Sequence, residues 1–149
     1  MRTPLNDHAA LHGLALFAAN AVAADTQASE DDLAKIYFGA AEGPRRQAPS
    51  AIGSYSRGCL AGAIALPRDG AAFQSMRLSR NRRWGHPSLV AFFTELAADV
   101  PALGLRGLLV GDLSQPRGGP MLSDHTSHQV GLDGDIWFQE MPEPRLSEV

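Results

Sequence analysis

The chain has 149 residues, of which 44% are hydrophobic, with 15 glycines and 10 prolines. This is the size of one ordinary domain. The formal net charge of −3 gives no general signal for nucleic-acid binding. No apolar run is long enough to span a bilayer.

The N-terminal region has the pattern of an export signal. An apolar run over 11–23 ends in Ala21-Val22-Ala23, which fits the small-x-small pattern of a cleavage site. We therefore predict a signal peptide over 1–23, with Ala24 as the first residue of the mature chain. The charged region before the run is weak, so an amphipathic or unstructured leader is the alternative. In an exported protein, the single cysteine Cys59 would indicate a missing partner or an intermolecular pair.

Residues 24–50 are expected to form a short helix and a linker. Ser29 can cap a helix over 29–39, Asp32 occupies the capping-box position, and Gly39 can end the helix. Residues 40–50 show no periodicity. The glycine-rich stretch 53–67 predicts short strands and turns, because repeated glycine disfavours a helix.

The clearest predicted helix covers 87–100. Pro87 suits its first turn, Pro101 stops it, and its apolar residues fall on one face. That face is formed by Leu89, Phe93, Leu96, Ala97 and Val100. Strands are predicted over 105–112 and 130–139, separated by a Gly/Pro-rich loop over 113–124.

The most informative stretch is 125–135, which holds His125, His128, Asp133 and Asp135. Histidine nitrogen and carboxylate oxygen are preferred zinc ligands. His128 and Asp135 are seven residues apart, so a continuous strand would point them to opposite faces. If both bind one metal, the backbone must turn between them, and Gly131 is the expected place.

Two alternatives about this cluster stay open from spacing alone. His125 could share an ion with His128 if both lie on one helical turn, or bind separately from a loop. Nearby histidines and aspartates also occur without any metal.

In the predicted strand, Asp133 and Asp135 share a face, and the opposite face points into a core. That second face consists of Leu132, Ile136 and Phe138.

Nucleophilic catalysis is disfavoured. Ser127 adjoins His128 without a G-x-S-x-G elbow, and Cys59 has no obvious activating partner.

A basic-aromatic cluster precedes the 87–100 helix. It could meet ligand carboxylates or nucleic-acid phosphates, or it could be a solvated face. His86 is interpreted as a helix-start residue or a support for a ligand rather than as a ligand itself. The remaining members are Arg77, Arg80, Arg82, Arg83 and Trp84.

Four stretches resemble, in the same order, the penicillin-insensitive murein endopeptidases. They are 52–59, 82–90, 110–119 and 125–135. The resemblance covers roughly 50–138, and the last stretch is its most specific part. It identifies 51–149 as the N-terminal portion of a murein endopeptidase domain.

The resemblance implies a periplasmic zinc peptidase that hydrolyses the D-alanyl–diaminopimelyl cross-link of peptidoglycan. It implies His125, His128 and Asp135 as zinc ligands. Its expected partners are cross-linked peptides, with no nucleic acid and no membrane after signal cleavage. The expected fold is α+β: a small, mostly antiparallel sheet with flanking helices, similar to D-Ala-D-Ala metallopeptidases but incomplete.

The resemblance also has departures. The family has a further zinc-binding histidine and a proposed catalytic base in a His-x-His arrangement, and a cysteine that pairs with the one matching Cys59. This sequence shows none of them, so the base is expected beyond residue 149. We therefore predict that the chain alone is inactive or nearly so. The alternatives are a non-catalytic cell-wall-binding or pseudoenzyme module, or a cytosolic protein with an N-terminal tail.

Overall fold

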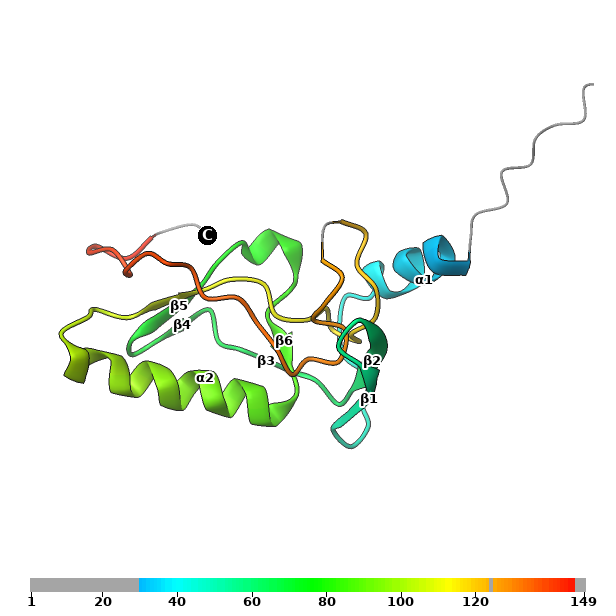
Figure 1. Cartoon of the computed structure of the whole chain (residues 1–149), viewed down its shortest axis with the longest axis horizontal. Helices are drawn as coiled ribbons and strands as arrows, with labels where there is room; N and C mark the ends of the chain where they lie inside the picture. The colour runs from blue at the N-terminus through cyan, green and yellow to red at the C-terminus, as the bar shows by residue number, and fades with distance from the viewer. Residues whose placement is uncertain (1–29, 124, 147–149) are drawn as a thin grey trace, which may run out of the picture.

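The structure, a computed structural model, describes residues 30–123 and 125–146 (Figure 1). The predicted signal peptide over 1–23 lies outside these residues. Within them the chain forms helices α1 (Glu30–Gly39) and α2 (Pro87–Asp99) and the 3-10 helices η1 (Leu78–Arg80) and η2 (Val100–Leu103). The strands are β1 (Ser50–Ser54), β2 (Arg57–Ala61), β3 (Ile64–Ala65), β4 (Asp69–Gly70), β5 (Phe73–Ser75), β6 (Trp84–Gly85) and β7 (Leu108–Val110). No helix in the described ranges is long and apolar enough to cross a membrane.

The strands form three small sheets rather than the one small sheet that was predicted. β1 and β2 make an antiparallel hairpin, β3 pairs with β6 antiparallel, and β5 lies between β4 and β7. The β4–β5 pair is antiparallel and the β5–β7 pair is parallel. The expected α+β class and the mostly antiparallel pairing are confirmed at this level.

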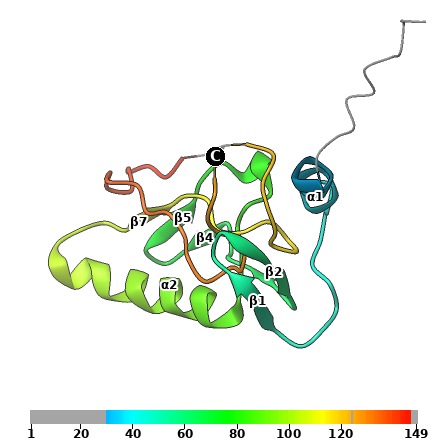
Figure 2. The same ribbon diagram turned by 45° about the vertical axis from the view of Figure 1, so that its right-hand side comes forward.

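Helix α2 packs against the β3–β6 and β4–β5–β7 sheets and forms the main core with them (Figures 1 and 2). It begins where His86 caps it, because the His86 side chain accepts a hydrogen bond from the Ser88 backbone N–H and Pro87 follows at the first position. The helix buries Leu89 and Phe93 as predicted. The core cluster comprises Leu66, Phe73, Leu89, Val90, Phe93, Ala97, Val110 and Leu113.

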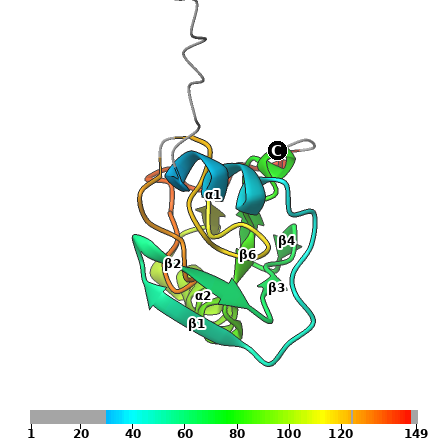
Figure 3. The ribbon, with the colours of Figure 1, turned by 90° about the vertical axis from the view of Figure 1, so that its right-hand side faces the viewer.

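Helix α1 confirms the prediction for 29–39 and lies over the Gly/Pro-rich loop (Figure 3). Its Phe38 ring covers Gly119 so closely that a Cβ added at Gly119 would lie 2.2 Å from the ring. A Cβ added at Gly39, at the end of α1, would likewise lie 3.0 Å from the Leu122 side chain. Glycine on both sides of this contact, at 39 in α1 and at 119 in the loop, therefore lets α1 pack closely against the loop.

The strand predicted over 130–139 is wrong. That segment makes one isolated antiparallel bridge, between Ile136 and Val110. Its alternate residues do not point into a core: Leu132 and Ile136 are exposed, and Phe138 is fully exposed. The glycines at 131 and 134 interrupt the regular backbone, so apolar alternation alone does not make a strand here. The strand predicted over 105–112 is confirmed only as the shorter β7.

Candidate metal centre

Backbone pairing places Asp135 beside the end of β7. The Gly111 N–H donates to the Asp135 carbonyl at 2.8 Å, and the Asp135 N–H donates to the Asp112 carbonyl at 3.0 Å. These two bonds continue from the Val110–Ile136 bridge. Asp112 and Asp135 thus lie next to each other although they are far apart in sequence.

The expected turn between His128 and Asp135 is present. Gly131 has φ 66°, and its carbonyl accepts from the His86 backbone N–H at 2.8 Å. A Cβ added to Gly131 would lie 2.4 Å from the Leu60 side chain, so glycine is required there for space as well as conformation. His128 itself adopts φ 65°, which is uncommon for a residue with a side chain.

This turn brings three predicted ligands together. One ligand atom each from His125, His128 and Asp135 can be chosen so that all lie within 4.8 Å of one another. His128 Nε2 is 3.5 Å from Asp135 Oδ1, close to the roughly 3.4 Å that separates two ligands of a tetrahedral zinc with bonds of about 2.1 Å. The His125 and His128 ring centroids are 5.0 Å apart, and both residues come from a loop rather than from one helical turn.

The donor set therefore fits zinc in chemistry and, for His128 and Asp135, in spacing. A shift of about 1.4 Å would bring a pair separated by 4.8 Å to ligand distance. His128 is buried at 4% exposure, whereas Asp135 is exposed, so the cluster combines a fixed ligand with solvent access.

Asp133 contacts the other ring nitrogen of His128. Its Oδ2 accepts a hydrogen bond from the His128 backbone N–H at 3.1 Å and lies 2.8 Å from Nδ1. Within the part of the chain that the structure describes, Nδ1 makes no hydrogen bond of standard geometry. The approach to Asp133 is therefore a close electrostatic contact that a small rotation of the carboxylate would align. Nε2 of His128 remains directed at Asp135.

Asp112 lies in a comparable position beside His125, which the sequence pattern did not indicate. Its Oδ2 accepts from Arg80 Nη1 at 2.9 Å and Arg82 Nη1 at 3.1 Å, and His125 Nε2 lies 3.1 Å from the same oxygen. A metal bound through His125 Nδ1 would leave the Asp112 contact in place, whereas binding through Nε2 would break it. The Asp112 side chain is 2% exposed, and its Oδ1 has no hydrogen-bond partner among the described residues.

The charge of Asp112 is maintained by the two guanidinium groups. Burial alone would raise the pKa of Asp112, but hydrogen bonds and charge from Arg80 and Arg82 outweigh it and hold the pKa below its ordinary value. Asp112 is therefore an ionised carboxylate inside the protein. The one available sequence signal was its position directly after a buried strand.

The basic-aromatic cluster is used largely within the molecule. Arg80 and Arg82 contact Asp112, Arg83 donates to the Leu66 carbonyl, and Arg77 lies over the Trp137 ring. The hypothesis of a solvated face is wrong for Arg82, whose side chain is 10% exposed. His86 is confirmed as a helix-start residue.

Together the fold and the cluster define an α+β domain with a histidine–aspartate centre suited to a divalent metal. A family profile for penicillin-insensitive murein endopeptidase matches residues 51–149. The chain belongs to the penicillin-insensitive murein endopeptidase family.

Curated relatives agree with this assignment. A penicillin-insensitive murein endopeptidase of Haemophilus influenzae is 48% identical over 90 residues, which are 60% of this chain and 32% of the relative. The protein of that name from Pectobacterium atrosepticum is 46% identical over 100 residues, or 67% of this chain and 35% of the relative. The one from Escherichia coli is 45% identical over 94 residues, or 63% and 34%. The chain spans about a third of the length of these relatives.

Proposed function

We propose that this chain carries the first part of the zinc site of a murein endopeptidase, with His125, His128 and Asp135 as its ligands. The observation that carries the proposal is the 3.5 Å separation of His128 Nε2 and Asp135 Oδ1, with His125 beside them. Family membership supports peptide hydrolysis in peptidoglycan as the reaction. The scissile bond in the proposal is the D-alanyl–diaminopimelyl cross-link.

Zinc at these residues would supply a Lewis acid that polarises a carbonyl and lowers the pKa of bound water. The protein's own contribution is positioning. The turn at Gly131 orients His128 toward Asp135, and Asp133 and Asp112 contact the two histidine rings. Exposed Asp135 leaves one side of the centre open to a substrate peptide.

We propose little or no turnover by the 149-residue chain itself. A zinc-activated water needs a positioned base, and the two carboxylates beside the histidines are already engaged. Asp133 accepts from the His128 backbone, and Asp112 is buried between two arginines. Because neither carboxylate is free to act as a base, these contacts also favour the alternative function, a non-catalytic cell-wall-binding module that retains the metal site.

The proposed location is the periplasm, reached through a signal peptide over 1–23. N-terminal sequencing of protein recovered from a periplasmic extract should give Ala24 as the first residue. An N-terminus that retains Met1 in that extract would contradict cleavage.

Zinc binding is the first test of the function. The purified chain should bind one zinc ion in a competition assay with a chromophoric chelator, and His128→Ala should weaken binding by at least about a hundredfold, because a ligand is lost. His86→Ser is the matched control: it removes an imidazole near the site but retains a residue that can cap α2. Zinc binding equal in His128→Ala and the parent chain would contradict the assignment.

Hydrolysis is measured separately on soluble cross-linked muropeptides. The zinc-loaded chain should release little or no monomeric product. Rapid turnover that disappears in His128→Ala would overturn the proposed inactivity while supporting the endopeptidase assignment. Zinc binding and muropeptide binding without turnover would favour the non-catalytic module.

A further inference from the structure

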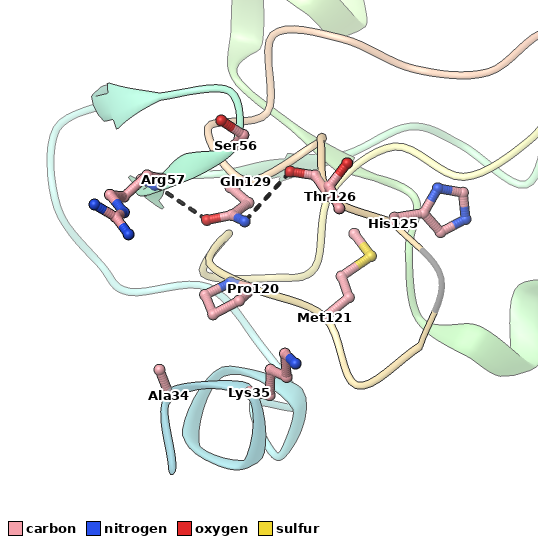
Figure 4. Close-up of a pocket in the computed structure, with 10 residues that line it drawn as sticks. Ala34, Lys35, Ser56, Arg57, Pro120, Met121, His125, Thr126 and Gln129 are labelled. Carbon is pink, nitrogen blue, oxygen red and sulfur yellow. Dashed lines mark hydrogen bonds between the residues drawn. The ribbon is translucent and has the colours of Figure 1, made fainter. Parts of the chain in front are cut away.

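A pocket of about 380 Å³ adjoins the candidate metal centre. Three separate segments line it: α1, the β1–β2 hairpin at 56–58, and loop residues at 120–121, 125–126 and 129 (Figure 4). His125 forms part of its wall, so one residue belongs to both the pocket and the metal cluster. The volume is within the usual range for small-ligand sites.

The pocket has an apolar part and a fixed polar wall. Ala34, Pro120 and Met121 supply the apolar surface, and Met121 is 3% exposed. Gln129 is buried, and its Oε1 accepts from the Gly58 backbone N–H at 3.1 Å. This bond ties the hairpin turn to the loop, so the wall between them is preorganised.

Two cations line the pocket, Lys35 from α1 and Arg57 from β2. Among the described residues that line it there is no aspartate or glutamate. Figure 4 shows the Lys35 amino group directed from α1 toward Pro120 and Met121. The nearby ion pair of Lys35 with Asp32 is long, at 3.9 Å, and both side chains are exposed, so it competes little with a ligand anion.

We propose that this pocket binds an aliphatic, carboxylate-bearing portion of the peptide substrate. The apolar wall suits a methylene chain, the two cations suit its carboxylate, and His125 places the bound peptide next to the metal centre. The inference rests on the proposed function, because it takes the murein stem peptide as the source of that carboxylate. Lys35 lies outside the residues that the family profile matches, so this charge comes from the chain's own N-terminal helix.

The test is a calorimetric titration of the whole chain with a soluble cross-linked muropeptide. Zinc is removed with a chelator so that no hydrolysis accompanies binding. Lys35→Met and Arg57→Met should each raise the dissociation constant about fivefold, as expected for one partly exposed charge contact. Chemical amidation of the muropeptide carboxylates should weaken its binding to the parent chain and have little further effect on the double variant.

Matched variants separate the pocket from general charge. Arg46→Met removes a cation from an exposed position that does not line the pocket, and it should leave affinity unchanged. Lys35→Arg and Arg57→Lys should restore most of the binding. Circular dichroism checks that each variant retains its helices.

The possible outcomes distinguish the carboxylate-binding pocket from the proposed zinc site. Binding that is equal in the parent chain, Lys35→Met and Arg57→Met would overturn the pocket assignment, even if the zinc assay succeeds. Absence of muropeptide binding by the parent chain would overturn it as well. If the chain does not bind zinc but its muropeptide affinity still depends on Lys35 and Arg57, the proposed zinc site is contradicted and the pocket assignment is supported.

Discussion

The carboxylate of Asp133 contacts His128 at Nδ1, the ring nitrogen that faces away from Asp135, at 2.8 Å. Carboxylates in this position fix the orientation of a metal-binding imidazole and raise its basicity. We expect Asp133→Asn to weaken zinc binding by about 10- to 100-fold, measured by competition with a chelator. The amide has almost the same shape, so the loss would report the charge rather than packing.

Asp99→Asn provides the control for Asp133, because it removes a carboxylate from an exposed position at the end of α2. It should leave zinc affinity unchanged. Equal affinities for Asp133→Asn and the parent chain would show that His128 is oriented by its backbone alone, through the φ of 65°.

The buried carboxylate of Asp112 is expected to contribute to the stability of the fold. Asp112→Asn leaves Arg80 and the nearly buried Arg82 without their anionic partner. Breaking a buried pair on one side costs about 3 kcal/mol, so the free energy of unfolding in urea should fall by about that amount.

The comparison variant for Asp112 is Glu140→Gln. Glu140 also meets an arginine, Arg106, at 3.1 Å, but both side chains are at least one-third exposed. The expected loss there is about 0.5 kcal/mol. Similar losses for the two variants would mean that burial adds nothing to the Asp112 contacts.

At the scale of elements, α1 depends on the bare backbone of Gly119. An alanine there would place its Cβ 2.2 Å from the Phe38 ring, at a φ of 78°. We expect Gly119→Ala to displace α1, detected as faster proteolysis within 30–39 and lower muropeptide affinity through the pocket that α1 helps to line.

Gly104→Ala is the control that separates the effect of the Phe38 contact from the effect of backbone strain. Gly104 has the same φ of 78°, and no atom of the described residues lies within 4 Å of an added Cβ. Its substitution should cost about 1 kcal/mol, from the backbone conformation alone, and leave α1 protected. Equal proteolysis of the two variants would contradict a specific role for the Phe38 contact.

Elements marked by local chemistry could be predicted from the sequence. α2 has a cap, a proline at its start and a periodic apolar face, so its limits follow from neighbouring residues. The segment over 130–139 has apolar alternation as well, but its pairing with β7 is limited to one bridge. Pairing depends on where a distant segment lies, and glycine at 131 redirects this one into a turn.

The same distinction applies to the site. His125, His128 and Asp135 lie within eleven residues, so one turn at Gly131 suffices to gather them, and that turn was predicted. Asp112 reaches His125 only through β7 and the backbone bonds to Asp135. Its two arginine partners come from η1 and the residues after it, a tertiary arrangement with no local sequence pattern.

For the whole molecule, the candidate metal centre gathers residues from segments that pair with different parts of the fold. The three sheets have two or three strands each. The loop with His125 and His128 contacts the hairpin through Gln129, whereas Asp135 pairs with the segment after β7. A metal held by all three ligands would cross-link these regions, so its binding should stabilise the fold as a whole.

We therefore expect zinc at 100 times its dissociation constant to stabilise the chain by about 2.7 kcal/mol. For a domain of this size that corresponds to a rise in Tm of roughly 10 °C, measured by calorimetry and reversed by a chelator. His128→Ala should remove the rise, whereas His86→Ser should retain it. A zinc-induced rise of the same size in His128→Ala would place the stabilising metal elsewhere, and two separate transitions, only one of them zinc-dependent, would contradict cross-linking of the whole fold.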